Sequence, residues 1–395
     1  MGGRGELSEV VGRAREGHNL DAAFGEGERA ADLPCATEAP AHGATRSVAP
    51  QPTRRMASCG TAGAGRAPCV RCGPGYRYDE ADDNHDLGPE RPAAMVSAKR
   101  IICVGHAALD RIYRIEAFPV QPTKVRALEH IESGGGMAAN AAVAIARLGG
   151  RAELWSRTGD DGAGSAIRAG LKAEGVDVRY LQAFDGPRSS TSAIIVDDKG
   201  ERLIVGQRDA GMPSGTSWLP LERIQGADAV LGDPRWLEGL RAVFSRARQE
   251  GVVTVLDADL GARDALAGIF TLTDYALCSA PALREFAPEG TDAQRLERVL
   301  ALGPRHAGVT LGEEGYLWRE RDGGGHVPAF RVCVTDTTGA GDAFHGAFAL
   351  LLAEGNPTGA CARYACAAAA LKCTRLGSRA GLPTRRELDT FLAGR

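Results

Sequence analysis

The chain has 395 residues, of which 44% are apolar and 25% charged, and these proportions exclude a fibrous repeat, a collagen and a wholly disordered protein. Its formal net charge of −3 provides no basic surface for nucleic acid or anionic lipid, so we expect neither as a partner. Because no long apolar run and no secretory signal pattern is present, we expect a cytoplasmic protein with reduced thiols and no membrane span.

The first 96 residues differ in composition from the rest of the chain. They contain no Lys, Ile or Trp, and their apolar residues are mostly Ala and Gly without a helical or strand period. Such a segment cannot bury enough apolar surface to offset the entropy lost on ordering. We therefore predict a disordered N-terminal extension over 1–96 and one folded domain over 97–395.

The folded part begins with strand patterns. A short apolar run at 101–104 predicts a buried strand, and an alternating strand follows it directly. Two alternating runs in 192–206 flank the sequence Asp-Asp-Lys-Gly, which favours a hairpin. We expect these segments, within about 108–132 and 188–207, to form a small β-sheet lid.

Helical patterns alternate with short β-branched runs through the rest of the chain. An Ala-rich helix is expected from Met137 and should end at Gly149 and Gly150, a C-cap signature. The later part contains apolar runs that predict strands, including 330–334, separated by amphipathic helices. This alternation predicts a three-layer α/β/α domain whose mainly parallel sheet is covered by helices on both faces.

The strongest chemical signal is the turn over 336–342, Asp-Thr-Thr-Gly-Ala-Gly-Asp, placed before a predicted helix. Glycines at a helix N-terminus allow close approach of a ligand, and free N–H groups with the helix dipole favour an anion such as a transferring phosphoryl group. Asp342 would lie in the first turn, where a carboxylate can accept a proton from a substrate hydroxyl. The alternative is an ordinary helix start with Thr338 as its N-cap.

This turn resembles the C-terminal signature of the ribokinase-like sugar kinases, the PfkB carbohydrate kinase family. The N-terminal signature of that family also has a counterpart in Gly-Gly-Gly-Met-Ala-Ala-Asn at 134–140, at the start of a helix. The two signatures occur in the expected order, and the resemblance extends over about 101–383. It implies a ribokinase-like α/β/α fold with a β-sheet lid, ATP and Mg²⁺ as cofactors, and a small sugar as substrate.

The resemblance also implies roles for individual residues. Asp342 would be the catalytic base, and the backbone of the turn would stabilise the phosphoryl group through Gly339, Ala340 and Gly341. The sugar would be bound by Asp110, Gly135, Gly136, Asn140 and Asp342. The nucleotide would be contacted by Thr310, Gly312, Gly315, Thr338, Gly339 and Gly341. A monovalent cation such as K⁺ would be held at Asp336 and Thr338, together with the loop 377–381.

One segment departs from the family pattern. Members commonly carry Asn-x-x-Glu near the magnesium–phosphate site, but residues 279–282 here read Ser-Ala-Pro-Ala. Mg²⁺ would then be held through water by other carboxylates, with Asp257 and Asp259 as candidates, or by the phosphates almost alone. The departure concerns the position of the metal and not the class of reaction.

Further stretches resemble the bacterial sulfofructose kinase branch, among them Asp-Arg-Ile-Tyr at 110–113, Asp-Pro-Arg-Trp at 233–236 and the segment 370–375. A fixed sulfonate requires a cationic pocket, for which Lys124 and Arg235 are candidates. The alternative is a solvated lysine and an arginine stacked on Trp236. A further polar residue expected beside the pair is replaced by Gly206, and the same cations would also suit a sugar phosphate or a sugar acid.

Together these features predict ATP-dependent phosphorylation of a sugar hydroxyl, with 6-deoxy-6-sulfofructose converted to its 1-phosphate as the specific prediction. The alternatives are a ribokinase, a fructokinase or another sugar or nucleoside kinase of the family. A further alternative, from another class, is a non-catalytic protein that binds a sugar or nucleotide. Because an exposed sheet edge pairs readily with another edge, we also expect a homodimer formed through the lid.

Overall fold

The computed structural model describes residues 97–198, 201–261 and 263–395. The predicted disordered extension over 1–96 lies outside the described residues, as do two turn residues of the predicted hairpin, 199 and 200. All described residues belong to one compact unit, Pro89–Arg395.

Within the described residues, the main sheet has nine strands. Their bounds are β1 (Arg100–Val104), β4 (Arg151–Gly159), β5 (Leu181–Phe184), β8 (Ala229–Gly232), β9 (Val253–Ala258), β10 (Tyr275–Ser279), β11 (His306–Thr310), β12 (Tyr316–Glu320) and β13 (Gly323–Val327). The order across the sheet is β13-β12-β11-β10-β9-β8-β1-β4-β5. All neighbouring strands from β11 to β5 pair in parallel, and the antiparallel strands β12 and β13 extend one edge.

The strand order reverses direction at β1. From β1 the chain continues to β4 and β5 on one side, and later returns to β8 on the other side and proceeds outward to β11. In open α/β sheets, ligands bind beyond the carboxyl ends of the strands at such a switch point. The segments that follow β1 and β8 are therefore expected to border the site.

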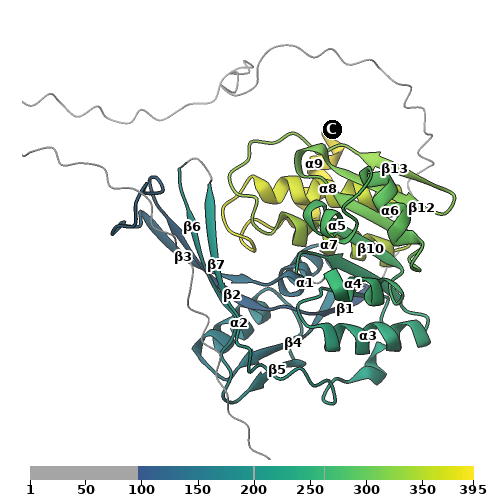
Figure 1. Cartoon of the computed structure of the whole chain (residues 1–395), viewed down its shortest axis with the longest axis horizontal. Helices are drawn as coiled ribbons and strands as arrows, with labels where there is room; N and C mark the ends of the chain where they lie inside the picture. Colours follow the sequence, from purple (N-terminus) through teal and green to yellow (C-terminus); the bar gives the residue numbers. More distant parts are fainter. Residues whose placement is uncertain (1–96, 199–200, 262) are drawn as a thin grey trace, which may run out of the picture. The chain divides into compact units, whose positions relative to one another are not determined.

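Helices cover both faces of the main sheet, as the alternation predicted (Figure 1). Buried residues of β1 alternate between the faces: Ile101 and Cys103 belong to one apolar core, and Ile102 and Val104 to the other. The first core also contains side chains of α1 (Met137–Arg147), α2 (Gly162–Ala173), α7 (Ala340–Ala353), α8 (Thr358–Cys373) and α9 (Arg385–Ala393). The second contains those of α3 (Leu237–Gln249), α4 (Arg263–Phe270), α5 (Ala280–Phe286) and α6 (Asp292–Leu300).

A second sheet of four strands forms the lid. Its strands are β2 (Ala108–Arg114), β3 (Glu129–Gly135), β6 (Thr191–Val196) and β7 (Arg202–Gln207), in the order β3-β2-β6-β7. The lid strands lie beside the layered body and extend away from it (Figure 1). β6 and β7 pair antiparallel, as the hairpin pattern predicted.

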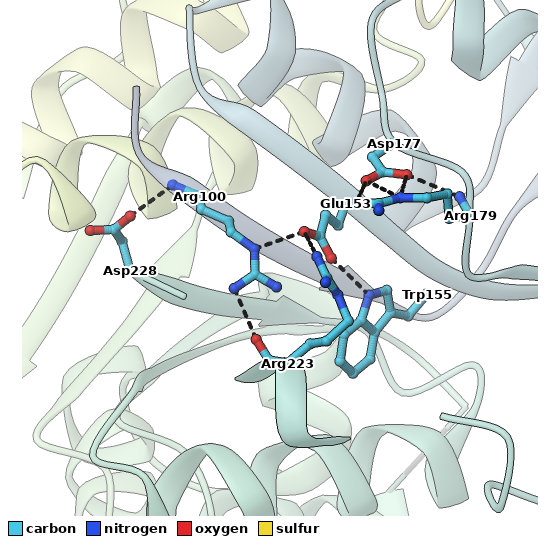
Figure 2. A network of polar contacts seen from close by, with 7 residues as sticks. All are labelled: Arg100, Glu153, Trp155, Asp177, Arg179, Arg223 and Asp228. Atoms are coloured by element: carbon cyan, nitrogen blue, oxygen red, sulfur yellow. Dashed lines mark hydrogen bonds and ion pairs between the residues drawn. The ribbon is translucent and has the colours of Figure 1, made fainter. Parts of the chain in front are cut away.

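A network of ion pairs lies at the end of the main sheet where β1 begins. The buried carboxylate of Glu153 in β4 accepts hydrogen bonds from Arg100 Nε at 2.7 Å and Arg223 Nη2 at 2.9 Å, so it lies between two guanidinium groups (Figure 2). Burial acts to raise the pKa of Glu153, but the hydrogen bonds from both arginines hold it below its usual value. We assign this network a role in stabilising the fold. It lies near the amino end of β1, whereas ligands of such sheets bind beyond the carboxyl ends of the strands.

The structure corrects one sequence prediction of the fold. Residues 330–334 do not form a strand but an irregular segment that leads to the glycine-rich turn. The antiparallel edge is instead made by β12 and β13. The cysteines among the described residues are all free. None of the helices in the described ranges has the length and apolar character needed to cross a membrane.

Candidate active site

The glycine-rich turn forms the N-terminus of α7. Gly339 is the N-cap residue and has a left-handed backbone with φ of 78°, which a glycine adopts without the strain that a side chain would add. A Cβ atom at this position would also approach the Cβ of Ser378 to 3.1 Å. Thr338 is therefore not the N-cap. The N–H of Ala340 already donates to the carbonyl of Thr337 at 3.2 Å, which leaves the next N–H groups of the first turn for a ligand.

Asp342 lies in the first turn of α7 and is held by a chain of hydrogen bonds. Its Oδ2 accepts from Asn140 Nδ2 at 2.7 Å, and Asn140 Oδ1 in turn accepts from Arg379 Nε at 2.8 Å. Burial, followed by the neighbouring Asp257 carboxylate, raises the pKa of Asp342 to about 7, against the lowering effect of the Asn140 hydrogen bond. A carboxylate with such a pKa can accept a proton near neutral pH.

A side chain at any of the three glycines before α1 would clash with a neighbouring residue, and that neighbour differs from one glycine to the next. A Cβ atom at Gly134 would lie 1.7 Å from Arg379 Nη1, and one at Gly135 would lie 2.2 Å from Asp110 Oδ2. Gly136 has φ of 91°, and a Cβ atom there would lie 2.5 Å from the carbonyl oxygen of His106. The loop thus brings the predicted sugar-binding residues Asp110, Gly135, Gly136 and Asn140 together with Asp342.

Asp233 follows β8 directly, and its side chain bonds to segments that meet at the switch point. This fully buried carboxylate accepts the N–H of His106 at 2.8 Å and of Ala138 at 2.9 Å through Oδ2, and the N–H of Arg235 at 2.8 Å through Oδ1. A Cβ atom at Gly105 would meet the same carboxylate at 2.2 Å. Asp233 therefore fixes the ends of β1 and β8 against the start of α1.

The predicted cation-binding residues are engaged by other groups. Asp336 accepts the N–H of Thr338 at 2.8 Å and of Gly377 at 2.9 Å, so the turn and the loop 377–381 meet as expected. Its other neighbour is the fully buried Lys372, whose Nζ lies 3.3 Å from Asp336 Oδ2 and donates to the Asp336 carbonyl at 2.8 Å. The hydroxyl of Thr338 lies 3.3 Å from Arg202 Nη1.

The predicted nucleotide-contacting loop follows β11. Thr310 ends the strand, and Gly312 begins a short 3₁₀ turn, η2 (Gly312–Glu314). Gly315 has φ of 94°, and a Cβ atom there would lie 2.0 Å from the carbonyl oxygen of Val327. Thr310 is the last residue of a parallel strand of the main sheet, so the loop after it borders the edge at which parallel α/β sheets bind ligands.

The two carboxylates suggested for Mg²⁺ both have protein partners. Asp257 Oδ2 lies 3.2 Å from the buried His345 Nδ1, and Asp259 pairs with Arg235 Nη2 at 2.7 Å. The described residues contain no group of three or more His, Cys, Asp or Glu side chains suited to hold a metal. Carboxylate oxygens such as those of Asp257 and Asp259 are the protein ligands that Mg²⁺ uses, one or two at a time, beside phosphate and water.

A cavity of about 180 Å³ lies beside the loop that contains the three glycines at 134–136, called the glycine loop below, and arginine side chains line it. Arg157, Arg208 and Arg235 line it together with His106 and Trp236, whereas Lys124 is not among its lining residues. Arg157, rather than Arg235, stacks on Trp236, with its guanidinium carbon 4.4 Å from the ring centre. Arg235 is instead tied to Asp259 and to the carbonyl of Leu260. Of the two candidates for a cationic pocket, Arg235 lines this cavity and Lys124 does not, and Arg157 and Arg208 line it as well.

The chain is similar in sequence and fold to known carbohydrate kinases. The sequence model described as "pfkB family carbohydrate kinase" matches residues 98–385. The chain belongs to this family. Ribokinase of Bacillus subtilis is 30% identical over 297 residues, which are 74% of this chain and 100% of the relative. Fructokinase-1 of Zea mays is 30% identical over 65% of this chain and 88% of its own length. A crystal structure from Agrobacterium tumefaciens, provisionally named a ribokinase, superposes with a TM-score of 0.73 at 37% identity and covers 75% of this chain and 98% of that one.

The protein is thus an ATP-dependent carbohydrate kinase with a ribokinase-like fold. Sequence reasoning did not assign roles to five residues of this kinase that the structure places at the site: Arg157, Arg208, Asp233, Arg379 and, apart from its place in a motif, Lys372. Three of them lay within stretches that the sequence analysis had singled out: Asp233 at 233–236, Lys372 at 370–375 and Arg379 in the loop 377–381. Arg157 and Arg208 carry no such signal, because their place at the cavity depends on contacts between distant parts of the chain.

Proposed function

We propose that this carbohydrate kinase phosphorylates a sugar that carries a terminal anionic group, with 6-deoxy-6-sulfofructose phosphorylated at O1 as the specific candidate. The observation that carries the proposal is the arginine-rich cavity beside the glycine loop. A sulfonate, phosphate or carboxylate placed there would receive charge-assisted hydrogen bonds, each worth about 1.5–3 kcal/mol.

The cavity has more positive than negative side chains in its lining, which favours the binding of an anion. The one acidic side chain in its lining, Asp209, already accepts the N–H groups of Arg188 and Gly211. Arg157 Nε is buried and has no hydrogen-bond partner within the described residues. Burial lowers the pKa of Arg157 to about 10, so the side chain remains charged at neutral pH. An uncompensated buried donor of this kind is stabilised when an anion binds.

The cavity also lies close to the proposed catalytic groups. Its lining includes His106 and Ala107, and these are the residues that a Cβ atom at Gly136 would contact. The glycine loop therefore separates the proposed anion pocket from Asp342 and Asn140. A sugar held over this loop would have its anionic end in the arginine pocket and a hydroxyl at the carboxylate.

For the reaction, we assign the role of general base to Asp342, which would take the proton of the attacking hydroxyl. The free N–H groups at the start of α7 would bind the transferring phosphoryl group, and the loop after β11 would contact the nucleotide through Thr310, Gly312 and Gly315. Mg²⁺, when bound with ATP, would neutralise phosphate charge. The lid would exclude water from the sugar, which limits hydrolysis of ATP.

A coupled ADP-release assay with 6-deoxy-6-sulfofructose, fructose, fructose 6-phosphate and ribose tests the substrate class. We expect one of the anionic sugars to have the highest kcat/KM. Arg208→Gln should lower kcat/KM for the anionic sugar by about 10-fold or more and change that for a neutral sugar by less than about twofold. Arg126→Gln, at an exposed position of the lid that does not line the cavity, is the matched control.

The alternatives make different predictions in the same assay. A ribokinase or fructokinase, as the names of the relatives suggest, would prefer a neutral sugar and lose little with Arg208→Gln. A non-catalytic binding protein would bind nucleotide and release no ADP with any sugar. The family match and the intact turn over 336–342 favour the enzyme.

We also propose a homodimer formed through the lid. Three consecutive residues of its edge strand β7, Leu203, Ile204 and Val205, are exposed at 49%, 52% and 57%. An apolar, unpaired edge of this kind is usually covered, here by a second copy of the chain. Light scattering should give the mass of a dimer for the wild type and of a monomer for Ile204→Lys. A wild-type monomer at micromolar concentration would contradict this proposal.

A further inference from the structure

We propose that the ammonium group of Lys372 takes the place of the monovalent cation that the family resemblance implies, so that this kinase works without K⁺. The inference rests on the proposed role of the turn over 336–342 in phosphoryl transfer. It concerns one position in the fold, the junction between that turn and the loop 377–381.

The oxygens that a cation would use at this junction already face positive groups. Lys372 Nζ contacts both the carboxylate and the carbonyl oxygen of Asp336, at 3.3 and 2.8 Å. The second predicted ligand, the hydroxyl of Thr338, lies 3.3 Å from Arg202 Nη1. A metal cation placed between these oxygens would be repelled by an ammonium and a guanidinium group at short range. The residues present therefore do not fit a bound K⁺.

The surrounding fold is built to hold the lysine in this position. Lys372 lies in the last turn of α8, where a positive charge interacts favourably with the helix dipole, and its side chain is fully buried. A Cβ atom at Gly381 would lie 3.1 Å from Lys372 Cε, so this glycine leaves room for the lysine stem. The carbonyl of Cys373, the next residue, accepts the N–H groups of Thr335 and Asp336.

The lysine also connects the turn over 336–342 to the segment 134–140 that contains the three glycines and Asn140. Asp336, which it neutralises, accepts the N–H of Gly377. The neighbouring Ser378 donates from its hydroxyl to the carbonyl of Gly134 at 2.9 Å, and Arg379 donates to Asn140. A fixed positive charge at Lys372 therefore holds the loop that positions Asn140 and, through it, Asp342. Lys372 is a positioning residue, because no contact with substrate is assigned to it.

The first test compares wild-type activity in chloride salts of K⁺, Na⁺ and tetramethylammonium at equal ionic strength, with nucleotide supplied free of K⁺. We expect kcat in the three salts to agree within about twofold. A wild-type rate that rises about 10-fold or more with K⁺, and saturates, would overturn the inference while leaving the kinase function intact. Absence of turnover in every salt would instead count against the proposed substrate, and the second test then decides on the cation.

The second test measures thermal unfolding in the same salts and does not depend on turnover. The wild type should unfold at the same temperature in K⁺ and tetramethylammonium, because no site for K⁺ is available. Lys372→Ala removes the ammonium and leaves the carboxylate of Asp336, so its unfolding temperature and any activity should rise with added K⁺. Lys172→Ala, at an exposed position of α2, is the control and should respond to neither salt. A saturable rise for the wild type in K⁺ would refute the inference even if the Lys372 variant fails to fold.

Discussion

Asp342→Asn is the substitution that most directly tests the proposed mechanism. The amide has nearly the same shape as the carboxylate, and its oxygen can still accept the hydrogen bond that Asn140 Nδ2 makes at 2.7 Å. It cannot accept a proton from a hydroxyl. General-base catalysis contributes about 10²–10⁴ in rate, so we expect kcat to fall by a factor in that range with little change in KM.

The same substitution should stabilise the fold above neutral pH. Burial and Asp257 raise the pKa of Asp342 from 3.8 to about 7, so the charged form is disfavoured in the folded protein. A group of this kind lowers stability progressively as pH rises between the two pKa values, by about 1.4 kcal/mol per pKa unit, or at most about 4 kcal/mol here. Removal of the charge should recover part of this at about pH 8 and almost nothing below about pH 4.

Both effects can be measured on the same protein preparations. Coupled ADP release gives kcat with the best sugar of the substrate screen, and thermal unfolding at two pH values gives the change in stability. Asp322→Asn, in the exposed turn between β12 and β13, controls for the loss of one negative charge. If Asp342→Asn transfers phosphate as fast as the wild type, the assignment of the base is wrong. A loss of stability at both pH values would show that the carboxylate has a structural role instead.

Three further outcomes follow from the structure. The rate of the wild type should rise with pH through about 7 and then level off, because Asp342 must lose its proton to act as a base; a rate that is flat from about pH 5 to 8 would contradict this. Gly135→Ala places a methyl group against Asp110, at 2.2 Å from Oδ2, and should raise the KM for sugar about 10-fold or more while nucleotide binding, measured by calorimetry, stays unchanged. Glu153→Gln weakens the buried pair with Arg100 far from the site, so the free energy of unfolding in urea should fall by about 3 kcal/mol while kcat remains within about twofold of the wild type.

The fold class followed from local patterns in the sequence. Strand and helix alternation predicted the three-layer domain, and the alternating runs after 101–104 and in 192–206 predicted lid strands within about 108–132 and 188–207. The error at 330–334 has a physical explanation. Arg331, Cys333 and Val334 are exposed in the structure, so this segment buries too little apolar surface to be held against the sheet as a strand. The segment therefore remains irregular although its residue types favour a strand.

The sequence by itself determined the groups whose chemistry depends on near neighbours: the glycine-rich turn, the helix that follows it and the carboxylate of Asp342 in its first turn. Only the tertiary structure decided which distant side chains act on them. Arg379 reaches Asn140 across 239 positions of sequence, Lys372 neutralises Asp336 from the end of another helix, and Arg157 occupies the cavity where Lys124 was expected. A pattern of residues fixes the local backbone, but contacts between segments depend on the order in which the strands assemble into the sheet, and no short stretch of sequence encodes that order.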